Sequence, residues 1–66
     1  MRLLRQIRRS RGLTQRDLGR LLGRSRELIS AIENGRRRAT RARLLELGSV
    51  LGEPPESLLE EKRDDS

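Results

Sequence analysis

Apolar residues along this chain recur at spacings of three and four, and they never alternate with polar residues over a strand-length run. This pattern predicts an all-α fold of five helical segments. Glycines, a proline pair and small polar capping residues separate the segments. The predicted segments are Arg2–Arg11, Gln15–Leu22, Arg26–Asn34, a segment capped by Thr40 that stops at Gly52, and a short one starting at Pro55 or Glu56.

The second and third segments are joined by a very short connection. Gly23 interrupts the apolar run between them, and glycine readily adopts the left-handed backbone that a sharp turn between helices requires. Thr14 is a favourable N-cap for the second segment, with Asp17 three residues on as a shortened capping box. Ser25 is placed to cap the third segment, so both helices are expected to begin directly after their caps.

These two segments are also expected to cross closely. Gly19 is small enough to let the third segment pass near the second. The apolar positions that would lie inside the crossing are Leu18, Leu22, Ile29 and Ile32. Two short crossed helices with a tight turn form the helix-turn-helix pattern, in which the second helix is presented to the major groove of DNA.

Length and composition limit how such a fold can be stabilised. The chain has 66 residues, no cysteine and no aromatic residue, so neither disulfides nor a thiolate metal site can supplement an aliphatic core. A single domain over residues 1–59 with a charged tail at 60–66 is expected. The small core favours a dimer. No apolar run reaches the length of a membrane span or a signal peptide, which favours a soluble, cytoplasmic protein without membrane contact.

Charge is distributed unevenly. Residues 1–43 contain 14 arginines against three acids, a net of +11, whereas residues 44–66 contain two bases against seven acids, a net of −5; together they give the total of +6. Charge alone allows either a polyanion-binding face or a solvated basic surface. The helix-turn-helix pattern favours the polyanion, and in particular double-stranded DNA.

The chain resembles the Cro/phage-repressor helix-turn-helix family, also called the XRE family, over about residues 2 to 59. The matching positions are Ile7-Arg8, Gly12-Leu13-Thr14-Gln15, Leu18, Gly23, Ser25, Ile29-Ser30, Ile32-Glu33-Asn34-Gly35 and Leu51-Gly52. The resemblance implies a compact five-helix fold like that of lambda repressor. The chain departs from the family at Arg24, usually apolar, at Gly19, usually alanine, and at Ala39, frequently proline.

The resemblance also implies which residues would read bases. The groove-facing positions are Ser25, Arg26, Glu27, Ser30 and Ala31. Arg26 can donate two hydrogen bonds to guanine, and Glu27 can accept one from the amino group of cytosine. The alternatives are a solvated Arg26–Glu27 pair, or an Arg26 that binds phosphate.

A second group of residues would hold the DNA backbone. In the family the glutamine that matches Gln15 grips a phosphate and braces the recognition helix. Arg24, where this chain departs from the family, either loosens the packing of the turn or binds phosphate. The basic loop and the helix after it supply further phosphate contacts from Arg36, Arg37, Arg38, Arg41 and Arg43. The resemblance pairs Arg8 with Glu33, an ion pair with a structural role.

The leading hypothesis is a small, sequence-specific transcriptional regulator, of the repressor type, that binds a palindromic operator as a homodimer in a prokaryotic or phage-infected cell. Its expected dimer surface is Leu47, Val50, Leu51, Leu58 and Leu59. The alternative is an antitoxin or adaptor that binds a protein partner through Leu58–Ser66. No catalytic residue, metal, cofactor or small-molecule effector is expected, since the chain has no histidine or cysteine and no converging pair of acids.

Overall fold

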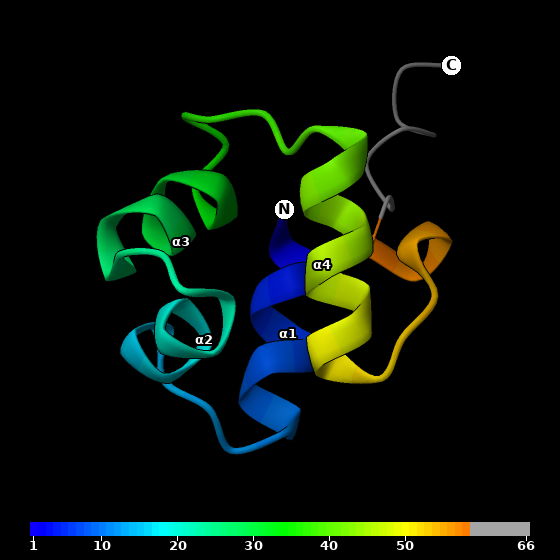
Figure 1. The fold of residues 1–66 in the computed structure, drawn as a ribbon, viewed down its shortest axis with the longest axis horizontal. Coiled ribbons are helices and arrows are strands. Elements are labelled where there is room, and N and C mark those ends of the chain that lie inside the picture. The colour runs from blue at the N-terminus through cyan, green and yellow to red at the C-terminus, as the bar shows by residue number, and fades with distance from the viewer. Residues whose placement is uncertain (59–66) are drawn as a thin grey trace.

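The computed structural model describes residues 1–58, and helices account for most of that part of the chain. The elements are α1 (Arg2–Ser10), α2 (Gln15–Leu22), α3 (Arg26–Glu33), α4 (Arg41–Leu51) and the 3-10 helix η1 (Pro55–Leu58). In Figure 1, α2 and α3 lie on one side of the molecule and η1 on the other, with α1 and α4 between them. Residues 1–58 contain no strand, in agreement with the expected all-α class.

The expected fifth α-helix is instead the single 3-10 turn η1. Pro55 is the first residue of η1, where its missing backbone N–H is no loss because the first N–H groups of a helix have no partner within it. The backbone of η1 is closed by the Ser57 N–H, which donates to the Pro54 carbonyl oxygen at 2.9 Å. The described part of the chain therefore contains four α-helices rather than five.

Small polar side chains start three of the helices, as the sequence predicts. The Thr14 hydroxyl accepts from the Asp17 N–H at 2.9 Å, and the Asp17 carboxylate accepts from the Thr14 N–H at 2.9 Å, which completes a capping box. Hydrogen bonding of the Asp17 carboxylate with Thr14, chiefly with the Thr14 backbone N–H and then with its side chain, lowers the pKa of Asp17 below its ordinary value of 3.8. Ser25 and Thr40 likewise accept from the third residue of α3 and α4.

The core is entirely aliphatic and draws on every element. Its buried members are Leu4, Leu18, Ile29, Ile32, Leu44, Leu47, Leu51 and Leu58. Of the four residues expected inside the α2–α3 crossing, three are buried and Leu22 is partly buried. Burial of these side chains is the main stabilising term available to a chain of this size.

This core corrects the expected dimer surface. Leu47, Leu51 and Leu58 are at most 2% exposed in the single chain, so a second copy cannot reach them without unfolding the first. They close the chain's own core because α4 and η1 pack against each other. Val50 is partly exposed. Leu59 lies outside the described residues, as do the predicted tail at 60–66 and all of the partner-binding element except Leu58.

The turn between α2 and α3 depends on two glycines. Gly23 ends α2 with φ of 69° and ψ of 30°, the left-handed conformation that glycine adopts without strain. Gly19 is buried beneath the turn, where an added Cβ would lie 2.8 Å from the Arg24 carbonyl oxygen and 3.1 Å from two atoms of Ser25. The glycine therefore permits close approach of the turn backbone itself, which sets how α3 leaves α2.

Within residues 1–58, no helix combines the length and apolar character that crossing a membrane would require.

Candidate nucleic-acid interface

The first turn of α3 carries the most exposed of the predicted base-reading side chains. The side chains of Arg26 and Glu27 are 59% and 78% exposed, and Ser25 is exposed as the N-cap. Arg26 and Glu27 approach each other only to 4.0 Å, an exposed pair that adds little to stability. Both side chains are therefore available to an external ligand. Ser30 and Ala31, one turn later, are partly buried.

A shallow hollow brings several of these residues together. Its volume is about 270 Å³, and its lining residues are Gln15, Arg26, Glu27, Ser30 and Arg36. The hollow thus combines three residues expected to read bases with two expected to bind phosphate. Ser25 and Ala31 do not line it.

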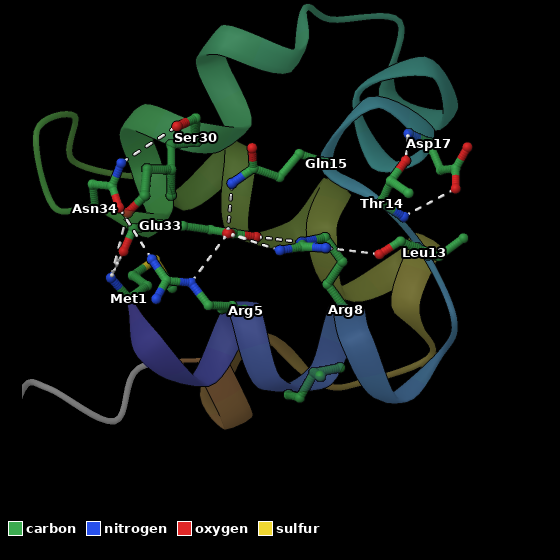
Figure 2. A network of polar contacts seen from close by, with 12 residues as sticks. Met1, Arg5, Arg8, Leu13, Thr14, Gln15, Asp17, Ser30, Glu33 and Asn34 are labelled. Atoms are coloured by element: carbon green, nitrogen blue, oxygen red, sulfur yellow. Dashed lines mark hydrogen bonds and ion pairs between the residues drawn. The ribbon is translucent and has the colours of Figure 1, made fainter.

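The far end of α3 is fixed by a buried carboxylate. Figure 2 shows Glu33 accepting hydrogen bonds from side chains of two other helices. Arg8 of α1 binds it through two nitrogens, with Nε to Oε2 at 2.6 Å and Nη2 to Oε1 at 3.1 Å. Gln15 of α2 donates its Nε2 to Oε1 at 3.0 Å, and the Arg5 Nε lies 3.5 Å from the same oxygen. One carboxylate therefore joins α1, α2 and α3.

Hydrogen bonding and charge keep Glu33 ionised. Burial by itself raises the pKa of a carboxyl group, and it is the largest influence on Glu33. The hydrogen bonds from Arg8 and Gln15, together with the positive charges of Arg8 and Arg5, outweigh it and hold the pKa of Glu33 below its ordinary value of 4.5. The remaining Arg8 nitrogen, Nη1, donates to the Leu13 carbonyl oxygen at 2.7 Å.

Gln15 makes a structural contact with α3. Its amide nitrogen is used by Glu33, while its side chain also lines the hollow beside Arg26. In this position the glutamine braces α3, as the resemblance implies. Glu33 takes one of the two N–H donors of the Gln15 amide, so a phosphate contact can use the second side-chain N–H or the backbone N–H groups at the start of α2.

The basic loop after α3 has a fixed backbone and exposed side chains. The N–H groups of Arg36 and Arg37 both donate to the Ala31 carbonyl oxygen, at 2.9 and 3.1 Å. Their guanidinium groups and that of Arg38 are exposed. The helix that follows differs: Arg41 is exposed, but Arg43 is bound to Glu46 at 2.6 Å and its side chain is only 20% exposed. In this structure Arg43 is paired with Glu46, whereas Arg41 is presented to solvent.

Two further arginines, Arg16 and Arg20, lie beside α3 and were not predicted from the sequence. A second hollow, of about 400 Å³, is lined by Arg16, Arg20, Arg24, Arg26 and Glu27. Arg16 and Arg20 are four residues apart on α2, so they project from one face of that helix. This spacing, followed by Arg24 just beyond the turn, was the available signal. Several guanidinium groups around one hollow form a surface suited to an anion.

The site does not have the composition of a metal centre. No group of three or more acidic side chains that could hold a metal ion occurs within residues 1–58, and histidine and cysteine are absent from the sequence. The chemistry that the described surface offers is hydrogen bonding and positive charge.

Comparison with known proteins supports the same interpretation. A family model described as a helix-turn-helix domain matches residues 2–61, nearly the whole chain. Neither a curated protein nor a solved structure gave a match. Families of this type are DNA-binding and typically lack enzymatic activity. The matched residues include α2, the Gly23 turn and α3 with its exposed first turn, and the chain belongs to the helix-turn-helix domain family of DNA-binding proteins.

Proposed function

We propose that this protein is a sequence-specific regulator of transcription that binds double-stranded DNA, of the Cro/phage-repressor type, and that it represses by occupying its operator. The observation that carries the proposal is that α3 is exposed at one end and held in place at the other. Its first turn is exposed between arginine-lined hollows, while its last residue, Glu33, is locked to α1 and α2. A rigidly held helix with an exposed N-terminal half is the geometry that reads the major groove.

Arg26 and Glu27 are the proposed principal base-reading residues. Both border the two hollows, so the bases that they contact would lie between flanking phosphates. Arg26 would donate to the O6 and N7 atoms of guanine, and Glu27 would accept from cytosine N4. Ser25, Ser30 and Ala31 would make the smaller contacts along the same face.

Phosphate binding would come from two groups of arginines. The loop group is Arg36, Arg37 and Arg38, with Arg41 beside it, and the α2 group is Arg16, Arg20 and Arg24. Contacts of this kind fix the position of the protein on the duplex without reading sequence. The same electrostatic contacts make affinity depend on salt.

The proposal is tested by selecting duplexes from a random pool and then comparing two variants. Arg26→Ala should cost about 1–3 kcal/mol on the selected duplex and relax the preference at one base pair. Arg37→Ala should weaken binding to all duplexes alike. A pool from which the wild-type protein enriches nothing would refute sequence-specific binding, and an equal loss on random DNA for Arg26→Ala would assign Arg26 to phosphate.

Specific binding also calls for a homodimer, because one helix-turn-helix covers only a half-site. The recognition helices of such dimers lie one helical turn apart, roughly 34–36 Å. The most exposed large apolar side chains among residues 1–58 are Leu21 at 57% and Leu45 at 51%. With Leu22 and Val50 they line a hollow of about 450 Å³ between α2 and α4. We place the contact with a second copy there, in place of the buried leucines.

A further inference from the structure

Beyond Glu33, a short chain of hydrogen bonds runs from α1 to a residue on the DNA-facing side of α3. The Arg5 Nη2 donates to the Asn34 Oδ1 at 3.0 Å, and the Asn34 Nδ2 donates to the Ser30 Oγ at 3.3 Å. Figure 2 shows Asn34 between the two partners. Ser30 lines the same hollow as Arg26 and Glu27, so this chain ends at the surface proposed to read bases.

The chemistry of arginine fixes the direction of these hydrogen bonds. A guanidinium group can only donate, so the Asn34 atom that faces Arg5 must be the carbonyl oxygen. The amide nitrogen of Asn34 must then face Ser30. Since an amide N–H donates, the Ser30 oxygen is the acceptor of this contact and its own hydrogen is left over.

No group among the described residues takes the Ser30 hydrogen. A helical serine commonly donates to a carbonyl oxygen in the preceding turn, as Ser10 does to Ile7 at 2.7 Å. Ser30 makes no such contact within residues 1–58; the Asn34 amide is its hydrogen-bond partner there. Its O–H is therefore free to point into the hollow.

We infer that Asn34, oriented by Arg5, makes Ser30 a hydrogen-bond donor toward a base and thereby sets part of the sequence preference. Asn34 is a positioning residue in this scheme, and Ser30 makes the contact. The inference rests on the proposed DNA-binding function. A donor at this place would select an acceptor on the base edge, such as a purine N7 or thymine O4, over the amino groups of cytosine or adenine.

The test is to reverse the direction of the hydrogen bond between Asn34 and Ser30. In Asn34→Asp, a carboxylate accepts from both Arg5 and Ser30, which uses the Ser30 hydrogen and leaves only lone pairs for the DNA. Selection from a random duplex pool is carried out with the wild type, Ser30→Ala and Asn34→Asp. Ser30→Ala should reduce the preference at one base pair, measured as the ratio of affinities for two duplexes, by about two- to tenfold. This is the ratio that one net hydrogen bond gives. Asn34→Asp should change the preferred pair at that same position.

The readout is the ratio between duplexes, because the added negative charge of Asn34→Asp lowers affinity for every sequence alike. Arg5→Lys keeps a donor-only partner and is the matched control, whose preference should equal that of the wild type. Arg5→Ala frees the amide to rotate and should weaken the preference at the Ser30 position only. Helical circular dichroism of each variant verifies folding.

Three results would overturn the inference while leaving the proposed function intact. They are an unchanged profile for Ser30→Ala, a uniform loss for Ser30→Ala that would assign the hydroxyl to phosphate, and an unchanged preference at that base pair for Asn34→Asp. Failure of the wild type to enrich any duplex would instead refute the proposed function.

Discussion

At the scale of single residues, Glu33 is the side chain that joins α3 to two other helices. It is an acid within the most basic part of the chain, and it is 3% exposed. Its partners come from two other helices, so the ion pair with Arg8 and the hydrogen bond from Gln15 place α3 relative to both. Breaking a buried pair by removing one partner costs about 3–5 kcal/mol, a large part of the stability of a small domain.

This ion pair predicts a dependence of stability on pH. Because the folded chain holds the pKa of Glu33 below 4.5, the unfolded chain takes up the proton first as the pH falls. The stabilisation is therefore fully present above about pH 4.5 and is lost as the pH falls through the folded pKa. Urea denaturation of the wild type from neutral pH down to about pH 3 should show this loss, and Glu33→Gln should show less of it. Equal pH dependence in the two proteins would contradict the prediction.

A second residue-scale prediction concerns Gly19. Alanine in the middle of a helix is favoured over glycine by roughly 1 kcal/mol, yet the new methyl group would lie 2.8 Å from the Arg24 carbonyl oxygen. We expect Gly19→Ala to lower the free energy of unfolding by about 1–3 kcal/mol, since the turn backbone must move. Ser49→Ala, at an exposed position of α4, is the control and should change stability by less than about 0.5 kcal/mol. A Gly19→Ala protein more stable than the wild type would rule out the clash.

A contact between two residues could be predicted where one local sequence pattern contains both of them. The Thr14–Asp17 capping box is such a case, because both partners lie within one turn. The Arg8–Glu33 contact came from the resemblance, not from spacing. The link from Arg5 through Asn34 to Ser30 was not predictable, since its Arg5–Asn34 contact joins residues 29 positions apart and depends on how α1 lies against α3.

At the scale of elements, the structure adds the arginines of α2 to the proposed DNA-binding surface. From the sequence, α2 was expected to support α3 and to contact phosphate through Gln15. In the structure Arg16 and Arg20 share a hollow with Arg26, which only the α2–α3 crossing brings about. Helix bounds were predictable from caps and glycines to within one residue at α1 and α3. The 3-10 geometry of η1 was not predictable, because a proline at the first position is compatible with either kind of helix.

The α2 arginines give an element-scale prediction about salt. Replacing Arg16 and Arg20 together by alanine should reduce the slope of log affinity against log salt by about two, because each neutralised phosphate contributes about one. Sequence preference should not change. Arg2→Ala, an exposed arginine of α1 that lines neither of the two hollows bordering α3, is the control and should leave the slope unchanged. An unchanged slope for the double variant would remove α2 from the DNA-binding surface.

At the scale of the whole molecule, charge and apolar surface are separated. The arginines concentrate in residues 1–43, whereas the exposed Leu21 and Leu45 lie between α2 and α4 in a hollow whose charged lining residue is Glu46. Sequence composition predicted an apolar surface on the acidic C-terminal part, but Leu21 belongs to the basic part, and Leu47, Leu51 and Leu58 are buried. The periodicity of the sequence predicts which residues lie on the apolar face of a helix. Which of these side chains are buried in the core depends on how α4 packs against η1.

The corresponding prediction concerns self-association. Replacing Leu21 and Leu45 together by serine should weaken dimer formation at least about tenfold, because exposed leucines at an interface centre contribute over 1 kcal/mol. Binding to a single half-site should be retained. Sedimentation on a palindromic duplex measures both, and Glu56→Ala, an exposed change on η1, is the control. A wild-type protein that stays monomeric on a palindrome at every concentration would refute the dimer.

The buried Arg8–Glu33 contact also restricts how this sequence can evolve. A single substitution at either position leaves the other charge inside the protein without its main partner, so one-step routes pass through a poorly folded chain. An apolar pair introduced at both positions at once could restore stability, but Gln15 would then lose its acceptor on α3. Fold and DNA recognition thus impose separate requirements on the same carboxylate, and descendants of this chain are expected to keep all three residues or to replace them together.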